Sequence, residues 1–233
     1  ESGVYIGSEA GKVLSTGDNN VLVGYHAGTA LTTGSSNVVI GKGAADALTQ
    51  GVDNVVIGHD AMGAASTTDG IDNNVAIGAY AGDGFTEAVE GTVIIGYAAG
   101  RAMETEADYT IAIGHSALTA LTSGEHNIGI GYEAGVAINT GDDNTLLGFG
   151  AGHSITGYDF NTAIGSYALY YSNNSYNTAV GYGAARGSSS AATFEKNTCI
   201  GYKSGFELDT GDGNVLIGDQ AGTNIGAGGS NVV

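Results

Sequence analysis

A glycine preceded by an aliphatic residue recurs along the whole chain of 233 residues, with a period of about 17 residues. Around it lies one template, Asn-[Val/Thr]-x-[Ile/Val/Leu]-Gly-x-x-Ala-Gly, with complete copies at 20–28, 144–152 and 214–222. A sustained period of this length is the signature of a repeat protein. The template glycines are Gly7, Gly24, Gly41, Gly58, Gly78, Gly96, Gly114, Gly131, Gly148, Gly165, Gly181, Gly201 and Gly218.

The template predicts short strands separated by tight turns. β-Branched residues precede the glycine, and the apolar spacing of a long helix is missing. We therefore expect an all-β fold, a parallel β-solenoid (β-roll) of about thirteen coils of about 17 residues, with residues 1–233 as a single repeat domain. Because the chain stops inside a template copy, we also expect it to be a fragment of a longer fibre chain.

The rows of apolar residues suggest which side chains fill the coil. We expect the aliphatic row before the glycine and the alanine row three residues after it to occupy the thin interior. The row two residues before the glycine then lies on the opposite face, and it carries no charge. Strands that are apolar on both faces are buried on both, so we expect another copy of the chain to cover this row. The expected oligomer interface is Leu22, Val39, Val56, Ile94, Leu146 and Leu216.

Asparagine occupies the position four residues before the glycine in most copies, and Thr92 and Thr110 replace it twice. In stacked coils these amides lie ~4.8 Å apart and can hydrogen-bond along a column. The predicted ladder consists of Asn20, Asn37, Asn54, Asn74, Asn127, Asn144, Asn161, Asn177, Asn197 and Asn214.

The charge of the chain excludes several classes of partner. Twenty-four Asp and Glu residues against six Lys and Arg residues give a net charge of −18. This charge repels nucleic acids and anionic membrane surfaces, and no apolar run is long enough for membrane insertion. We therefore expect neither partner. The one cysteine, Cys199, cannot form an intrachain disulfide and is interpreted as a packing residue.

The Asn-x-x-Ile-Gly-x-x-Ala coils resemble the head repeats of YadA-like trimeric autotransporter adhesins. The Thr-Gly-x-x-Asn turns at 33–37 and 140–144 look like the β-solenoid repeats of bacteriophage tail fibres. The resemblance covers essentially the whole chain and implies a left-handed homotrimeric β-roll used for attachment. The chain departs from the adhesin heads in having longer coils than theirs.

Several residues invite a more specific function. Aromatic residues directly follow the glycine in six copies, and such a stripe could stack against sugars or stiffen the rod by stacking on itself. The adjacent acids Asp142 and Asp143 are a weak candidate for Ca²⁺ or for paired-acid chemistry, but they lie at the recurrent turn, where Asp is expected. We predict no catalytic residue, no enzyme activity and no required cofactor. The aromatic residues are Tyr25, Tyr97, Tyr132, Phe149, Tyr182 and Tyr202.

Together these features predict an acidic, extracellular segment of a trimeric fibre, belonging to a phage tail fibre on a virion or to an adhesin on a bacterial surface. Its partners are expected to be two further copies of itself and a glycan or protein receptor on a cell surface. The alternatives are a subunit of a self-assembling filament and a monomeric ice- or mineral-binding solenoid. Two coils are enlarged, through 66–73 and 188–196, and we expect these insertions to project from the turn before the asparagine ladder.

Overall fold

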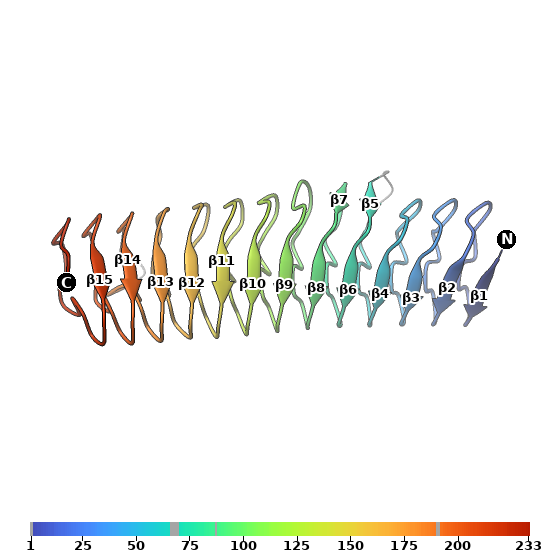
Figure 1. The fold of residues 1–233 in the computed structure, drawn as a ribbon. Coiled ribbons are helices and arrows are strands. Elements are labelled where there is room, and N and C mark those ends of the chain that lie inside the picture. The colour runs from blue at the N-terminus through green and yellow to red at the C-terminus, as the bar shows by residue number, and fades with distance from the viewer. Residues whose placement is uncertain (1, 66–69, 87, 190–191) are drawn as a thin grey trace.

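The computed structural model describes residues 2–65, 70–86, 88–189 and 192–233, and they form one long stack of coils (Figure 1). Thirteen strands build a single parallel sheet, and β5 with β7 forms a second, two-stranded sheet. The all-β parallel solenoid is therefore confirmed, with about twelve turns between the first and last strands. The strands are β1 Gly3–Ile6, β2 Asn20–Val23, β3 Val38–Ile40, β4 Val55–Ile57, β5 Ile71–Asp72, β6 Val75–Ile77, β7 Val89–Glu90, β8 Val93–Ile95, β9 Ile111–Ile113, β10 Ile128–Ile130, β11 Thr145–Leu147, β12 Thr162–Ile164, β13 Thr178–Val180, β14 Thr198–Ile200 and β15 Val215–Ile217.

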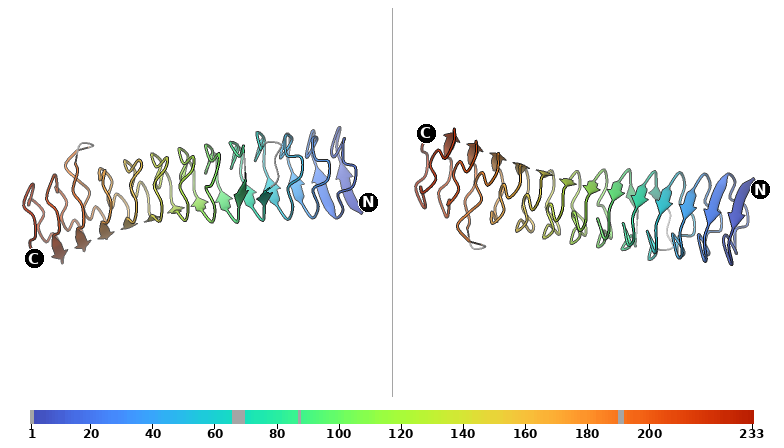
Figure 2. Two further views of the ribbon diagram at one scale, coloured as in Figure 1. Left: turned by 90° about the horizontal axis from the view of Figure 1, so that it is seen from above. Right: turned by 90° about the horizontal axis from the view of Figure 1, so that it is seen from below.

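Each strand of the large sheet pairs in parallel with the equivalent strand of the next coil. Val38 of β3, for example, lies between Val21 of β2 and Val55 of β4. The strands follow one another along one side of the rod, and irregular segments and turns complete each coil (Figure 2). With a strand spacing of about 4.8 Å, twelve steps give a rod about 58 Å long.

The interior of the coil contains four rows of side chains. One row holds the asparagines, and a second holds the residues two before the glycine, such as Leu146. The third is the alanine row, represented by Ala151, and the fourth is a row of larger residues such as Ile155. All of these are fully buried within a single chain, so the coil needs no partner to cover its core.

The expected oligomer interface is wrong. Apart from Tyr5 in the first coil, the residues two before the glycine are buried in the single chain, because they point into the coil and not toward a partner. The aliphatic row directly before the glycine, expected inside the coil, points outward instead. The residues wrongly expected at the interface, and found inside the coil, are Leu22, Val39, Val56, Ile94, Leu146 and Leu216.

The outward face of the large sheet is nevertheless apolar. Two positions of each strand, three residues and one residue before the glycine, alternate with the buried position and are half-buried or exposed. The position nearest the glycine is aliphatic in every coil, and its exposure reaches 43% at Leu147 and 57% at Ile217. The other position is Val or Ile except for the threonines of β11 to β14, which stand in register with one another.

The interior row two before the glycine varies in size, and neighbouring residues compensate for the variation. Gly129 leaves space that Leu118 of the preceding coil fills, since a Cβ on Gly129 would lie 2.6 Å from Cγ of Leu118. Leu118 itself has a φ of 48°, at a position where most coils have glycine. The coil therefore keeps its cross-section while exchanging volume between two positions.

The enlarged coils contribute to the core. Ile71 lies in β5 and is fully buried, and Phe194 and Ala192 of the other insertion are also fully buried. Residues 66–69 and 190–191 lie outside the described residues, so the expected projection of the insertions is not tested there. The described parts pack inward because each insertion carries its own apolar side chain into the row of large residues.

Candidate functional site

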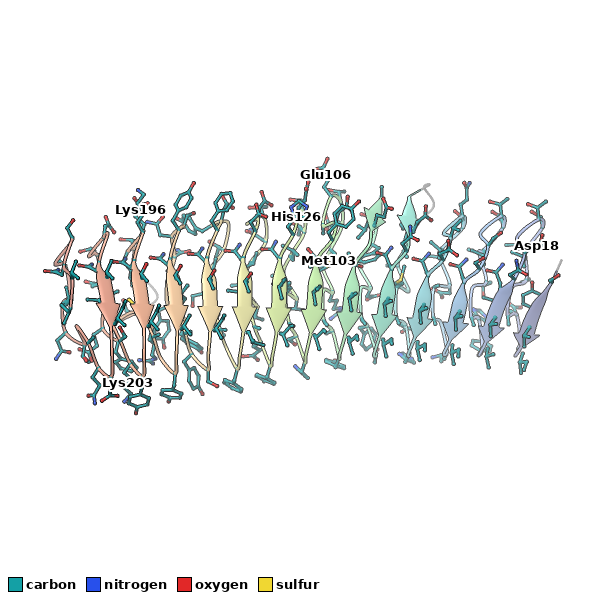
Figure 3. All side chains as sticks on the ribbon, in the orientation of Figure 1. Asp18, Met103, Glu106, His126, Lys196 and Lys203 are labelled. Carbon is teal, nitrogen blue, oxygen red and sulfur yellow. The ribbon has the colours of Figure 1, made fainter. Side chains whose placement is uncertain are left out.

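The aromatic residues that follow the template glycine lie at one edge of the rod, where the strands end. All six predicted residues are exposed, from 43% at Tyr132 to 53% at Tyr25. Figure 3 shows aromatic rings along the edge that carries Lys203, opposite the edge that carries Lys196 and His126. The structure brings five of the six into one column, and Tyr25 stacks on its neighbour His26.

In the middle of this column the aromatic rings stack face to face on one another. Tyr97, His115, Tyr132 and Phe149 stand on successive coils with ring centroids 5.0 to 5.2 Å apart and interplanar angles of 8° to 24°. Nearly parallel rings at this distance gain stacking energy and cover one another's faces. The stripe therefore stiffens this stretch of the rod and presents ring edges, rather than open faces, to a ligand.

Sequence reasoning missed two members of the column. Tyr80 and Tyr167 lie one position later in the template than the other aromatic residues, and each bridges a coil that has Ala79 or Ser166 at the usual position. Both have a φ near 60°, and the equivalent residues of the other coils also have a positive φ, for example 52° at Glu133. The contacts of Tyr167 are edge-on, with interplanar angles of 64° to Phe149 and 85° to Tyr182. The parallel stacking of rings along the column is therefore interrupted at Tyr167.

The predicted asparagines form a buried column of hydrogen bonds. The backbone N–H and the amide Nδ2 of Asn37 both donate to Oδ1 of Asn20, at 3.0 and 3.1 Å. Nδ2 of Asn37 also donates to the carbonyl of Gly51 in the following coil at 2.7 Å. Of the two threonines in this row, Thr92 donates its hydroxyl to Oδ1 of Asn74 at 2.8 Å, whereas the Thr110 hydroxyl donates to the carbonyl of Asp108 in its own coil at 3.5 Å. The column thus joins neighbouring coils and gives hydrogen-bond partners to buried polar groups that would otherwise have none.

The acids at the turn have a structural role. The Asp142 carboxylate accepts the backbone N–H of Glu125 at 2.9 Å, and the Asp143 carboxylate lies 3.6 Å from Nδ1 of His126. Among the described residues no group of three His, Cys, Asp or Glu side chains is placed to hold a metal ion. Around Asp142 and Asp143 the described residues therefore provide no set of ligands for Ca²⁺. The carboxylates that accept a turn N–H of the preceding coil belong to Asp18, Asp72, Asp108, Asp142, Asp159 and Asp212.

Cys199 lies in the interior row two before the glycine and is fully buried. Burial raises the pKa of its thiol to about 12, because the thiolate would lose its hydration inside the coil. The side chain therefore packs as a small apolar group, as the sequence predicted, and it is not placed for nucleophilic chemistry.

Comparisons with protein-family models, curated proteins and solved structures found no match to the chain. Among the described residues, no helical segment has the length and apolarity needed to cross a bilayer. Two surfaces of this molecule bear on its function: the outward sheet face and the aromatic edge.

Proposed function

We propose that the chain is a rigid segment of an extracellular attachment fibre, assembled as a left-handed homotrimer through the outward face of the large sheet. The observation that carries the proposal is the uninterrupted aliphatic row on that face. It has one Ile, Val or Leu per coil for about 58 Å, with no charged residue.

The charge distribution supports an interface on this face. The chain has a net charge of −18, yet neither outward position of any strand in the large sheet is charged. Half-buried Ile57 and Ile95 lie in a stripe that water would meet along its whole length. Contiguous exposed apolar surface of this kind marks interaction sites, and parallel sheets are normally covered on both faces.

Three copies and a left-handed coil are what the resemblance to YadA-like heads and tail-fibre repeats implies. A narrow straight stripe suits such an assembly, because three rods can place their stripes around a common axis. The stacked aromatic column and the asparagine column stiffen each rod, which favours a role in holding a distant binding surface away from its support. The fibre role is thus a proposal about assembly and mechanics, in which the chain performs no reaction.

Two adjacent leucines give a matched test. Leu146 points into the coil and is fully buried, whereas Leu147 points outward and is 43% exposed. Leu147→Glu should leave the fold intact and abolish the trimer, because charged residues would meet at the interface. Leu146→Glu should unfold the chain, because an unpaired carboxylate inside the coil costs several kcal/mol. Sedimentation equilibrium gives the mass, and circular dichroism gives the folded fraction.

The unmodified chain is expected to sediment at three times the chain mass of 23.1 kDa. A folded monomer at micromolar concentration would overturn the proposed assembly, as would an unchanged trimer in the Leu147→Glu variant. A mass that grows without limit with concentration would instead favour the filament alternative, in which the end coils join.

A further inference from the structure

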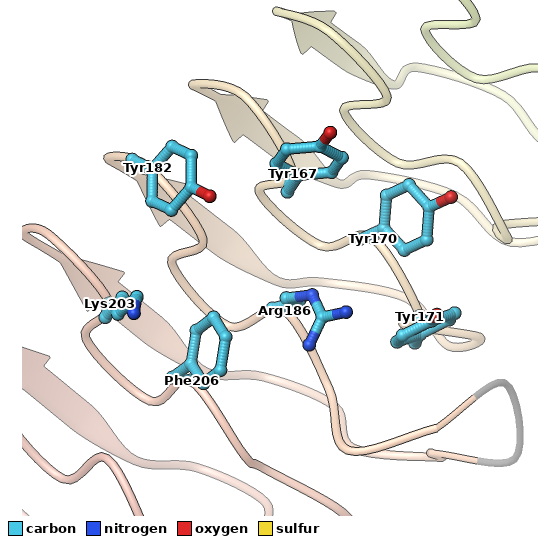
Figure 4. A pocket seen from close by; sticks show the side chains of 7 residues that line it. All are labelled: Tyr167, Tyr170, Tyr171, Tyr182, Arg186, Lys203 and Phe206. Carbon is cyan, nitrogen blue, oxygen red and sulfur yellow. The ribbon is translucent and has the colours of Figure 1, made fainter.

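A hollow of about 420 Å³ interrupts the aromatic edge near the C-terminal end of the rod (Figure 4). Three successive coils contribute its walls, through the segments that follow β12, β13 and β14. Five aromatic rings and two cations line it, with no acidic residue among them. Its volume lies within the range of pockets that bind small ligands, which is roughly 300 to 1,000 Å³.

Glycines and changes in coil length make room for the rings. A Cβ on Gly183 would approach the Phe206 ring to 3.0 Å, and a Cβ on Gly187 would approach Cβ of Tyr171 to 3.0 Å. The coil that begins at Gly165 has the shortest interval between template glycines, and the coil after it has one of the two longest. The hollow therefore lies where the regular repeat is broken.

Three of the four Lys and Arg residues outside the hollow pair with a carboxylate, and among the described residues Lys42 is the exception. Lys12, Arg101 and Lys196 each contact a neighbouring carboxylate. In contrast, within the described part of the chain Arg186 and Lys203 form no ion pair with a carboxylate. They face rings instead.

The Arg186 guanidinium carbon lies 5.0 Å from the Tyr171 ring centroid and 5.1 Å from that of Phe206. The Lys203 ammonium lies 5.0 Å from the centroid of Phe206. Ring faces compensate a cation only weakly where water has access, so both groups keep hydrogen-bond donors for an anion.

The rings around the cations are not stacked on one another. Tyr170 meets Tyr171 at 85° and Tyr167 at 64°, in contrast to the nearly parallel rings of the middle of the column. Two of the lining rings also stack outside the hollow, Tyr170 on His153 at 4.5 Å and Tyr182 on Tyr202 at 5.6 Å, so the rings line the hollow at different angles. The site thus combines flat apolar surfaces with two cations that line the same pocket.

We propose that this hollow binds an acidic sugar, a pyranose ring that carries a carboxylate, within a cell-surface glycan. The C–H face of the pyranose packs on a tyrosine ring that lines the hollow, and the carboxylate accepts hydrogen bonds from the Arg186 guanidinium and the Lys203 ammonium. This inference rests on the proposed attachment function and names its ligand class. It needs only one chain, since every lining residue comes from 167–206.

Calorimetric titration of the full chain with matched oligosaccharides tests the proposal. The acidic probes are 3′-sialyllactose and trigalacturonic acid, and their neutral counterparts are lactose and the carboxyl-reduced trisaccharide. At least one acidic probe should bind, with its neutral counterpart at least tenfold weaker, which corresponds to about 1.4 kcal/mol. Equal binding of both members of each pair, or binding of neither acidic probe at millimolar concentration, would overturn the proposal.

Variants locate the binding. Arg186→Gln should weaken it about tenfold and Lys203→Gln about threefold, because each removes a charge that contacts the carboxylate. Arg101→Gln is the matched control, since Arg101 also lies over a tyrosine, 5.3 Å from the Tyr80 centroid, but outside the hollow. If Arg101→Gln weakens binding as much as Arg186→Gln does, general charge and not this hollow holds the ligand, and the site is refuted.

A phosphorylated sugar would present the same negative charge, so inorganic phosphate is included as a competitor. The phosphate concentration is kept below the level at which phosphate screens charges in general. Displacement of the acidic sugar under that condition would assign the site to a phosphate group and overturn the carboxylate specificity. The titrations are repeated on the Leu147→Glu variant. That variant should bind as the unmodified chain does, because the hollow needs only one chain. Binding by an unmodified chain that sediments as a monomer would refute only the trimer, and an unmodified trimer without binding would refute only this inference.

Discussion

Replacing Asn144 by alanine tests how much the asparagine column stabilises the coil. The amide Nδ2 of Asn144 donates to the carbonyl of Tyr158 at 2.9 Å. Its Oδ1 accepts the backbone N–H of Asn161 at 3.0 Å and the amide Nδ2 of Asn161 at 3.1 Å. Nδ2 of Asn144 also donates to Oδ1 of Asn127 at 3.1 Å and to the carbonyl of Asp142 at 3.0 Å. Asn144→Ala removes all five bonds, but these last two acceptors each keep a backbone N–H donor, from Asn144 and Phe160.

The expected loss follows from the groups left without a partner. The N–H of Asn161 and the carbonyl of Tyr158 both lose the amide, whereas Nδ2 of Asn161 keeps a second acceptor, the carbonyl of Asp159 at 3.2 Å. Two unsatisfied groups at about 1 to 3 kcal/mol each give a destabilisation of about 2 to 6 kcal/mol.

Urea denaturation measures the free energy of unfolding, and amide hydrogen exchange of Asn161 gives a local measurement. Protection of that amide should fall in Asn144→Ala more than at amides several coils away. Asn173→Ala serves as control, because that side chain accepts one hydrogen bond at the surface, from the Thr156 hydroxyl. A loss below about 1 kcal/mol, equal to that of the control, would refute the reasoning, since surface substitutions cost about 0.5 kcal/mol or less.

Three further outcomes are expected. Gly131→Ala should lower the free energy of unfolding, measured in a thermal melt, by about 3 kcal/mol or more, because φ is +138° and the new Cβ would lie 2.4 Å from the Gly148 carbonyl oxygen. Gly226→Ala is the control, since there is open space around that residue, and an equal loss in both variants would contradict the explanation. Burial, together with the charges of Asp60 and Asp83, raises the pKa of Asp46, so its charged form is disfavoured in the fold. Asp46→Asn should raise Tm at pH 7, and the gain should vanish below pH 3.8, where both states are protonated; a pH-independent gain would be inconsistent with this cause. Cys199 should not react with a thiol reagent at pH 8 until urea unfolds the chain, and rapid labelling of the folded chain would show that the coil opens locally.

The period of the template was sufficient to predict the short strands, the stacking of the coils and the parallel sheet. Each repeat has one short strand, and stacking equivalent strands in parallel is the simplest way to pair them. The direction of the side chains was predicted wrongly, since both faces of the strand are apolar and the pattern of apolar residues alone does not distinguish them. Asn144 and Leu146 have the same parity in the strand, so a buried asparagine column already requires Leu146 to point inward. The small residues Ala163 and Cys199 in that row are a second signal of a confined interior.

The aromatic edge was only partly predictable. Tyr97 and Tyr132 occupy a fixed template position, so their alignment follows from the period alone. Tyr167 joins the column from one position later in the template, and a pattern defined by a single aromatic position does not include it. The hollow around Arg186 depends on one short coil followed by one long coil, and the resulting offsets between neighbouring side chains are not fixed by the repeat.

The backbone hydrogen bonds between coils run along the axis of the rod, since each strand pairs only with its sequence neighbours. A force that pulls the two ends apart therefore loads one coil-to-coil contact after another in series, rather than shearing many bonds at once. Each coil that detaches would release about 50 Å of chain, the extended length of one repeat less one strand spacing. Under tension such a rod lengthens in steps of one coil, and it dissipates the work of a sudden pull while the coils nearer the support remain folded.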